Sequence, residues 1–313
     1  MRDCVMIVGC GMMGSGIGAM SALAGHKTLL VDVDEAHVNS GVKKAIDCIT
    51  LREENGLHTH EEARRAKTLI MTSTNMKEAA ASAFLVIEAI VENLEVKQDL
   101  FAKLDEMLPA EIPICSNTSG LRITDISKKC KYPERTVTTH FWLPAHLVPL
   151  VEVVMGDKTD EEIAKKVLNE LKDWKKSPVL VKRDLPGQLA NRIFQAIIRE
   201  SIDIVASGLA SAEDVDTAIS CGMAMRFPVW GPLKHLDAIG LNLGLSVQDT
   251  VLPDICAEKQ ANAYIRNLVS EKNLGAKTGK GFYNWEERSI EKDIEKRDQF
   301  IIEAVKITNR LEN

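Results

Sequence analysis

The sequence predicts an α/β protein with a doubly wound, mostly parallel sheet, followed by an all-helical C-terminal domain. Two observations favour this order. Short apolar runs alternate with helical patterns from Cys4 to Val181, whereas the chain from Gln188 to about Leu274 has few strand signals. Continuous apolar runs are typical of parallel strands that are covered on both faces. Their alternation with helices is the pattern of βαβ units.

The expected elements follow from these runs. Residues 35–75 are charged and helical in pattern, so we expect two helices that leave the sheet and return. A further helix is expected over 93–108. The five strands that the apolar runs predict are 4–8, 27–32, 83–91, 112–117 and 135–141.

The change of character after "VKRDLPG" (181–187) predicts a domain boundary near Asp184. We therefore expect a sheet-containing domain over 1–184 and a helical domain over 185–285. Residues 286–313 are expected to form a charged helical tail. Its apolar positions are Phe300, Ile301, Ala304, Val305 and Leu311.

Composition excludes several classes of protein. The chain has 313 residues, 45% hydrophobic and 27% charged, with a net charge of −6, so it can bury a large core and nucleic acid is not an expected partner. No apolar run approaches the length of a membrane span, and the N-terminus does not resemble a signal peptide. Seven cysteines without CxxC spacing predict neither a disulfide framework nor a metal site, and favour a cytoplasmic location.

The stretch "VMIVGCGMMGSG" (5–16) places Gly9, Gly11 and Gly14 between a strand and a helix. Gly9 permits a tight turn, Gly11 lets the backbone approach a pyrophosphate, and Gly14 lets the helix pack closely on the strand. Asp32 ends the next strand, where its carboxylate would accept hydrogen bonds from ribose hydroxyls and repel a 2′-phosphate. The pattern predicts a Rossmann-type domain that binds NAD rather than NADP.

A second signal is the pair His140 and Glu152 in the apolar stretch "TTHFWLPAHLVPLVEVV" (138–154). Pro144 and Pro149 exclude a continuous helix, so two extended segments joined by "WLPAH" are expected to bring the two side chains together. A carboxylate on one imidazole nitrogen stabilises the protonated ring, and the other nitrogen can take a proton from an alcohol. The alternative is a core histidine that bonds a backbone carbonyl.

Five segments together resemble the 3-hydroxyacyl-CoA dehydrogenase family. They are "VIEAIVENLEVKQDLFAKLD" (86–105), "SNTSG" (116–120), the His140–Glu152 stretch, "LPGQLANRI" (185–193) and "GAKTGKGFYNW" (275–285). The resemblance implies reversible oxidation of a 3-hydroxyacyl group with NAD. It also implies that residues 1–184 bind NAD, and that the helical domain 185–285 carries substrate contacts and the interface of a homodimer.

The resemblance also implies roles for individual residues. His140 and Glu152 match the catalytic dyad, while Ser119 and Asn191 match residues that hydrogen-bond the substrate; as alternatives, Ser119 or Asn191 could cap a helix and Lys97 could be a solvated helix residue. His146 is interpreted as non-catalytic. The predicted cofactor contacts are Gly9, Gly11, Met12, Met13, Gly14, Asp32, Glu92, Lys97, Asn117 and Lys277.

Two departures leave the substrate open. Leu143 stands before Pro144 where the family usually has Asn, so a side chain expected to bond the nicotinamide ribose is absent. The stretch "GMAMRFPVWGPLKHLDAIGLN" (222–242) resembles the branch of carnitine dehydrogenase and lambda-crystallin, and Arg226 would hold a free carboxylate there. The ending "KTGKGFYNW" resembles 3-hydroxybutyryl-CoA enzymes instead.

The sequence favours a short-chain 3-hydroxyacyl-CoA as substrate, with NAD as the cofactor and no metal. Arg64, Arg65 and Lys67 are candidates for contacting the CoA phosphates. The alternatives are the same chemistry on a small free hydroxy acid, a dehydrogenase that uses Lys182, and a non-catalytic, crystallin-like structural protein. The intact pair His140 and Glu152 argues against the last two.

Overall fold

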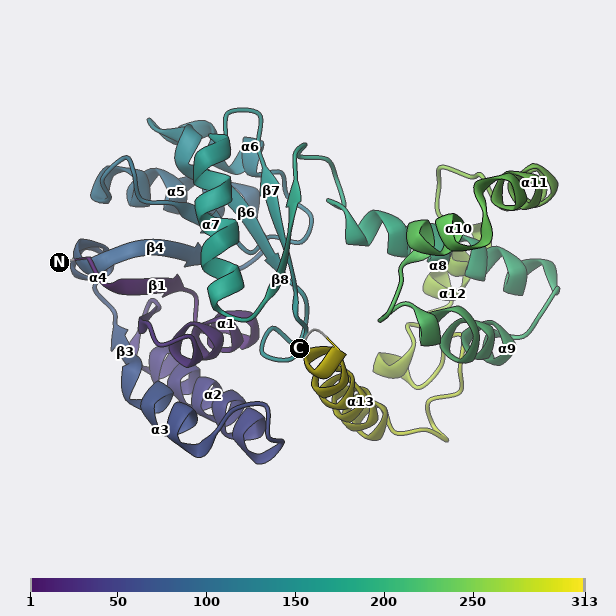
Figure 1. Ribbon diagram of the computed structural model, residues 1–313, viewed down its shortest axis with the longest axis horizontal. Helices are drawn as coiled ribbons and strands as arrows, with labels where there is room; N and C mark the ends of the chain where they lie inside the picture. Colours follow the sequence, from purple (N-terminus) through teal and green to yellow (C-terminus); the bar gives the residue numbers. More distant parts are fainter. Residues whose placement is uncertain (1, 312–313) are drawn as a thin grey trace. The chain divides into compact units, whose positions relative to one another are not determined.

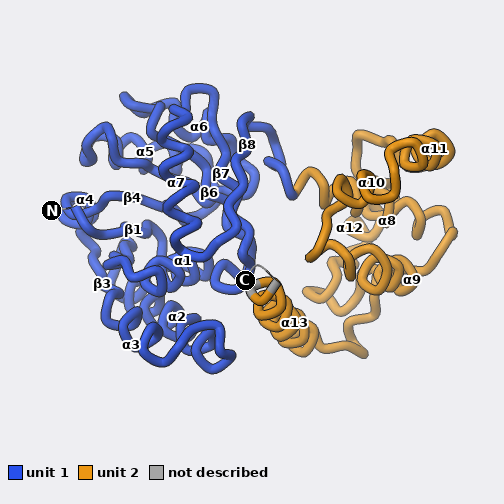
Figure 2. The backbone as a smooth tube through the Cα atoms, in the orientation of Figure 1, with its two compact units in different colours: residues 1–190 blue, residues 191–313 orange. Residues whose placement is uncertain are grey.

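The computed structural model describes residues 2–311. The chain divides into two compact units, Met1–Ala190 and Asn191–Asn313, which Figure 2 shows in different colours. The predicted boundary near Asp184 lies a few residues before this division and stays a prediction. No helix in the described part of the chain is both long and apolar enough to cross a membrane.

The first unit is built on one eight-stranded sheet with the order β3-β2-β1-β4-β5-β6-β7-β8. All neighbouring strands run parallel except β6 and β7, which are antiparallel. The sheet confirms the predicted fold class. The strands are β1 (Cys4–Val8), β2 (Lys27–Val31), β3 (Ile70–Ser73), β4 (Ala83–Glu88), β5 (Ile114–Ser116), β6 (Thr136–Phe141), β7 (Leu150–Met155) and β8 (Ser177–Val181).

Helices cover both faces of this sheet (Figure 1). Successive side chains of β1 alternate between two cores: Val5 and Ile7 pack on one face, Met6 and Val8 on the other. A strand with both faces buried needs apolar residues at every position, which explains its continuous apolar run. One face is covered by α1 (Met12–Leu23), α2 (Glu35–Glu54), α3 (His60–Leu69) and α7 (Glu161–Asp173), the other by α4 (Met76–Ser82), α5 (Leu94–Met107) and α6 (Ile123–Ile126).

Local capping sets where the helices begin. The Asp34 side chain accepts from the His37 amide at the start of α2, and Asn93 does the same for Val96 at the start of α5. Thr59 and Glu62 form a capping box at the start of α3. The predicted helix 93–108 therefore agrees with α5 to within a residue at each end.

Some predicted boundaries were wrong. The strand expected over 83–91 ends at Glu88, because the chain turns there to form the edge of the site described below. The region 35–75 contains the two expected helices but ends in the strand β3, which was not predicted. β3 is short and partly exposed, so it lacks the apolar run that marked the other strands. β8 was also missing from the predicted strands.

The second unit is helical, as expected. Its helices are α8 (Ala190–Ser207), α9 (Ala212–Thr217), α10 (Pro232–Ile239), α11 (Leu241–Val251), α12 (Ala263–Ser270) and α13 (Ile290–Leu311), with α8 starting at the last residue of the first unit. α13 is the expected helical tail. Ile302 and Val305 are buried, Phe300 is exposed, and the side chain of Leu311 lies outside the described part.

Candidate active site

The predicted site residues of the first unit gather where β1, β4, β5 and β6 end. The strand order reverses between β1 and β4, and ligands of doubly wound sheets bind outside the carboxyl ends of the strands at this point. β1 ends at Val8, directly before the glycine turn, and β4 ends at Glu88, directly before the stretch that contains Glu92. The sequence motifs for the cofactor therefore meet at this edge of the sheet (Figure 1).

The three glycines have different surroundings. Gly9 has a φ of +101°, and a Cβ there would lie 2.6 Å from the Ala89 carbonyl oxygen, so the turn requires glycine. A Cβ on Gly14 would lie 1.8 Å from the Gly9 carbonyl oxygen, which forces close packing of the helix on the turn. A Cβ on Gly11 would meet no atom within 4 Å, so this position leaves open space in front of the turn.

Helix α1 begins at Met12, directly after Gly11. Gly11 is its N-cap, and no side chain caps its first turn. The amides there can donate to an anion, with the helix dipole in support. Met12 is largely exposed and Met13 is partly buried against the core. The turn thus fits a pyrophosphate, as an NAD site requires.

Asp32 lies beside the turn and supports it. One carboxylate oxygen, Oδ2, accepts from the Cys10 amide at 2.7 Å, and the other, Oδ1, accepts from the Val33 amide at 2.7 Å. Asp32 also lines a cavity of about 500 Å³ together with Gly9, Ile90 and Lys103. A carboxylate at the wall of a cavity next to the glycine turn is where the adenosine ribose of NAD is expected.

A buried network follows the end of β4. Lys97 is 1% exposed and its Nζ lies 2.5 Å from Oε1 of the fully buried Glu88. The other oxygen of Glu88 accepts from the Ser116 hydroxyl at 2.6 Å. Lys97 also lies 3.3 Å from Glu92. The alternative of a solvated Lys97 is therefore wrong, and Glu88, which the sequence analysis did not single out, is its principal partner.

Glu92 connects this network to the loop that carries Ser119. Its Oε1 accepts from the Thr118 hydroxyl at 2.5 Å and from the amides of Ser119 and Gly120 at 3.1 and 3.2 Å. Burial opposes ionisation, but the bonds from Thr118 and Gly120 and the charge of Lys97 lower the pKa of Glu92. The Ser119 residue is exposed.

Neither Asn117 nor Ser119 lies in a helix. The Asn117 side-chain oxygen accepts from the Phe141 amide at 2.9 Å and so ties the end of β5 to the end of β6. α6 begins at Ile123 after an Arg122 that makes no side-chain cap, so Ser119 does not cap this helix. Asn117 thus fixes the backbone next to His140, while Ser119 stands at the surface of the same loop.

His140 and Glu152 are direct partners across the antiparallel pair β6 and β7. His140 Nδ1 lies 2.7 Å from Glu152 Oε2, and the two residues are 5% and 0% exposed. The partner of His140 Nδ1 is thus a carboxylate and not a backbone carbonyl, which was the alternative. Glu152 Oε1 accepts from the amides of Leu189 and Ala190 at 2.9 and 2.8 Å.

Glu152 is held as a carboxylate. Its burial by itself raises the pKa, but hydrogen bonds from His140, the Ala190 amide, the Trp142 indole and the Leu189 amide lower the pKa to about 2. An ionised carboxylate facing Nδ1 stabilises the imidazolium form of the ring and fixes its tautomer.

The loop between β6 and β7 is held by two basic side chains that are buried. Lys176 is buried and donates to the carbonyls of Ala145 and Val148 at 2.5 and 2.9 Å. Arg52 of α2 donates to the carbonyl of His146. Leu143 is half exposed in this loop and offers no side-chain hydrogen bond. The loop that joins the two site strands is therefore anchored from two other elements.

The remaining predicted residues lie in or near the second unit. Asn191 is the second residue of α8 and follows Ala190, whose amide bonds Glu152. Arg226 and Lys277 each lie in a short 3-10 turn and are exposed. Lys182, at the end of β8, is exposed as well. Within residues 2–311, no group of three or more His, Cys, Asp or Glu side chains is arranged to hold a metal.

Comparison with known proteins agrees with this geometry. Residues 4–185 match the NAD binding domain, and residues 187–285 the C-terminal domain, of 3-hydroxyacyl-CoA dehydrogenase. The chain belongs to the 3-hydroxyacyl-CoA dehydrogenase family. It is an NAD-dependent oxidoreductase that acts on a CH–OH group.

Relatives in this family have different named substrates. A probable 3-hydroxybutyryl-CoA dehydrogenase of Bacillus subtilis is 35% identical over 91% of this chain and 98% of its own. The 5-formyl-3-hydroxy-2-methylpyridine 4-carboxylate 5-dehydrogenase of Mesorhizobium japonicum is 30% identical over 89% of each chain.

The solved structures similar to this chain also differ in the substrates that their names give. A crystal structure of a 5-formyl-3-hydroxy-2-methylpyridine 4-carboxylic acid 5-dehydrogenase, an NAD+-dependent dismutase, has a TM-score of 0.89 and 27% identity over 99% of both chains. The 3-hydroxybutyryl-CoA dehydrogenase of Ralstonia eutropha has a TM-score of 0.74 and 30% identity over 91% of this chain and 99% of its own.

Proposed function

We propose that this dehydrogenase interconverts a short-chain L-3-hydroxyacyl-CoA, such as 3-hydroxybutyryl-CoA, and its 3-keto form, with His140 and Glu152 as the catalytic dyad. The observation that carries the proposal is the buried contact of 2.7 Å between His140 Nδ1 and Glu152 Oε2. It stands at the edge of the sheet where the glycine turn and the Glu92 loop also end.

The dyad supplies the proton transfer. With Nδ1 held by Glu152, the other nitrogen, Nε2, takes the proton of the substrate hydroxyl as the hydride leaves C3. The imidazolium that forms is stabilised by the carboxylate, which stays ionised because its pKa is about 2. In the reverse direction the same nitrogen returns the proton to the carbonyl oxygen. The cofactor, when bound, would accept the hydride as NAD in the oxidation and supply it as NADH in the reduction.

The chain's own residues would hold NAD in three places. The glycine turn and the first turn of α1 receive the pyrophosphate, and Asp32 receives the adenosine ribose. Glu92 and Asn117 follow the ends of β4 and β5, and Lys97 of α5 is paired with Glu88 at the end of β4. The nicotinamide half is expected at these strand ends. The open space in front of Gly11 and the cavity beside Asp32 fit this placement. Met12, Met13 and Lys277 complete the proposed set.

Ser119 and Asn191 are proposed to hydrogen-bond the substrate near C3. Ser119 is exposed on the loop that Glu92 holds, so its hydroxyl is accessible. Asn191 directly follows the Ala190 amide that bonds Glu152. For the thioester, Arg64 and Arg65 of α3 are exposed and would contact the CoA phosphates, whereas Lys67 is already paired with Glu53 at 3.1 Å.

A small free acid is the second candidate substrate. The observation in its favour is the TM-score of 0.89, over 99% of both chains, with a dehydrogenase named for a pyridine carboxylic acid. The likeness to the 3-hydroxybutyryl-CoA dehydrogenases of Ralstonia eutropha and Bacillus subtilis extends over 91% of this chain. Arg226 is the residue proposed to hold a free carboxylate.

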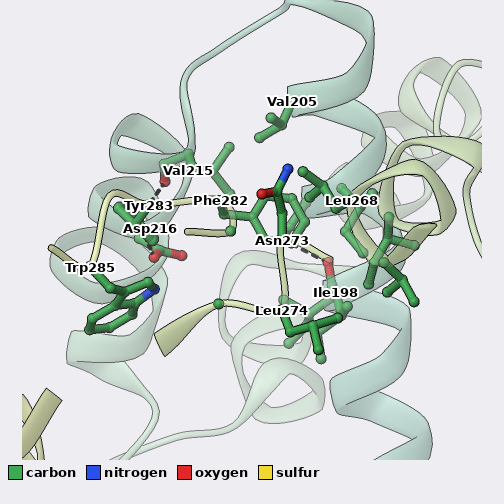
Figure 3. A pocket seen from close by; sticks show the side chains of 18 of the residues that line it. Ile198, Val205, Val215, Asp216, Leu268, Asn273, Leu274, Phe282, Tyr283 and Trp285 are labelled. Carbon is green, nitrogen blue, oxygen red and sulfur yellow. Dashed lines mark hydrogen bonds between the residues drawn. The ribbon is translucent and has the colours of Figure 1, made fainter. Parts of the chain in front are cut away.

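We also propose that the protein is a homodimer formed through the second unit. Many large apolar side chains of this unit are exposed, and apolar side chains that gather on a surface mark protein–protein interfaces. An apolar cavity of about 640 Å³ opens beside α8 (Figure 3), with Tyr283 donating to Asp216 at 2.5 Å among its lining residues. The exposed apolar residues include Phe194, Met225, Phe227, Leu233, Leu241 and Leu245.

Three measurements test these proposals. The first follows NADH absorbance with a panel of CoA thioesters and free hydroxy acids. Reduction of acetoacetyl-CoA by NADH supports the thioester, whereas oxidation of a free hydroxy acid with no reaction of acetoacetyl-CoA refutes it and leaves the hydride chemistry standing. Charge reversal at Arg64 and Arg65 should raise KM only for a CoA substrate, and Arg226→Ala should abolish recognition only of a free acid.

The second measurement concerns the dyad. His140→Ala should lower kcat by about 10²–10⁴, the range for a lost general acid–base group, while NAD still binds. His146→Ala is the matched control, because the neighbouring histidine has no proposed part in the reaction. Near-normal turnover in His140→Ala would show that the buried pair is only structural. The dimer is tested by sedimentation, where a monomer at micromolar concentration contradicts it.

A further inference from the structure

Trp142 makes a contact that neither the motifs nor the proposed dyad accounts for. Its indole Nε1 donates to Glu152 Oε2 at 3.0 Å. This is the same carboxylate oxygen that faces His140 Nδ1 at 2.7 Å. The rings of Trp142 and His140 lie 5.7 Å apart at a tilt of 53°. The indole thus stands beside the imidazole, and both face one oxygen atom.

The two donors together complete the hydrogen bonding of this carboxylate. A carboxylate oxygen has two lone-pair sites. Oε2 uses them for His140 and Trp142, while Oε1 uses its two for the amides of Leu189 and Ala190. With both oxygens saturated, rotation of the carboxylate would break bonds at each end. Its orientation towards His140 is therefore fixed.

The indole contact is not demanded by burial. Trp142 is only partly buried, so its N–H could be satisfied by water. Instead it is directed to the carboxylate of Glu152, which is 0% exposed. A neutral N–H that shares Oε2 also withdraws part of the negative charge that would otherwise act on the imidazole alone.

We propose that Trp142 is a positioning residue of the dyad, which acts through Glu152 and not on the substrate. It holds Oε2 against His140 Nδ1 and weakens Oε2 as a hydrogen-bond acceptor. The imidazolium that forms during oxidation therefore releases its proton more readily. This inference rests on the proposed role of the dyad. Trp142 directly precedes Leu143, the position at which the chain departs from the family pattern.

The first test is the pH profile of kcat/KM in the direction of oxidation. A general base acts only in its unprotonated form, so the proposed dyad makes this rate fall at acid pH. In Trp142→Phe, Oε2 loses a competing donor and stabilises the imidazolium more strongly. The acid limb should therefore move to higher pH, by about 0.5–1 unit for the loss of one hydrogen bond. The plateau rate should fall several-fold, because the carboxylate is less rigidly held.

A matched control is available in the same unit. Trp174 Nε1 donates to Glu170 Oε1 at 2.9 Å, which is the same type of bond away from the dyad. Trp174→Phe should leave the acid limb unchanged, whatever it does to stability. If Trp142→Phe also leaves the acid limb of the pH profile in place and changes only the plateau value of kcat/KM, Trp142 merely packs in the loop. That result overturns the proposal.

The second test needs no activity. The indole N–H resonance of Trp142 can be assigned in the NMR spectrum of the cofactor-free protein by its loss in Trp142→Phe. In Glu152→Gln this resonance should move upfield and exchange faster, because a neutral amide is a weaker acceptor. An unaffected resonance refutes the bond. Loss of turnover in His140→Ala tests the dyad separately, so a failed positioning role is distinguishable from a failed proposed function.

Discussion

Glu152→Gln should change the response of stability to pH in a defined way. The pKa of Glu152 in the folded protein is about 2, against 4.5 for an unperturbed carboxyl. Because the folded-state pKa is depressed, the carboxylate stabilises the fold fully above pH 4.5, and this contribution is lost as the pH falls towards 2. The full difference corresponds to about 3 kcal/mol at 1.36 kcal/mol per unit.

The measurement is the free energy of unfolding of the wild type and of Glu152→Gln at pH 6 and pH 3. The glutamine does not titrate, so the difference between the two proteins isolates Glu152 from the other carboxyls. The wild type should lose about 2 kcal/mol more than the variant over this range. The same variant should lower kcat, because the imidazolium loses its counter-charge.

The assay must report on the first unit alone, because two units need not unfold together. Trp142 and Trp174 lie in this unit, while Trp230 and Trp285 lie in the second. With Trp230→Phe and Trp285→Phe as background, tryptophan fluorescence follows the unit that contains the dyad. If the free energy of unfolding of the wild type and of Glu152→Gln changes equally between pH 6 and pH 3, the reasoning is refuted, since Glu152 would then have an ordinary pKa.

Two further predictions concern Asp32 and Lys176. Asp32→Ala should raise the KM for NAD by about 10–100-fold, the loss expected for hydrogen bonds to a charged group, and should reduce the preference for NAD over NADP. Asp32→Asn keeps an acceptor for the Cys10 amide, so it should reduce this preference with a smaller rise in the KM for NAD. Equal effects of both variants in steady-state kinetics would count against a role of the charge. Burial lowers the pKa of Lys176 from 10.5 to about 7, so the unfolded chain binds more protons between these values and the fold gains about 2 kcal/mol from pH 7 to pH 9. Denaturation of Lys176→Met at both pH values should lack this gain, and an equal gain in the variant would show that Lys176 stays charged.

Predictions from the sequence were most accurate where local rules apply. The run 4–8 is β1, because a strand buried on both faces must be apolar at every position. The glycine turn was predicted from its spacing, since a positive φ at Gly9 and the contact of Gly14 with the turn both require glycine. The proximity of His140 and Glu152 followed from two prolines that exclude a helix.

Other parts of the site could not be predicted in this way. Glu88 and Lys97 are nine residues apart in different elements, and nothing in their spacing marks them as a buried ion pair. The bonds from Leu189 and Ala190 to Glu152 depend on where the chain passes after β8. Trp142 looks like one more apolar residue in its stretch, and only its contact with Oε2 reveals a polar function.

The sequence by itself determined the order of the elements, the glycine turn and the pairing of two extended segments around the prolines, because each depends on backbone preferences within a few residues. The tertiary structure decided the register that sets His140 directly opposite Glu152 and the four donors that keep Glu152 ionised. It also decided that the buried basic side chains of Lys176 and Arg52 hold the loop between β6 and β7. These features join side chains from separate elements. Their energies come from burial and hydrogen-bond geometry, which exist only once the sheet and its helices have packed.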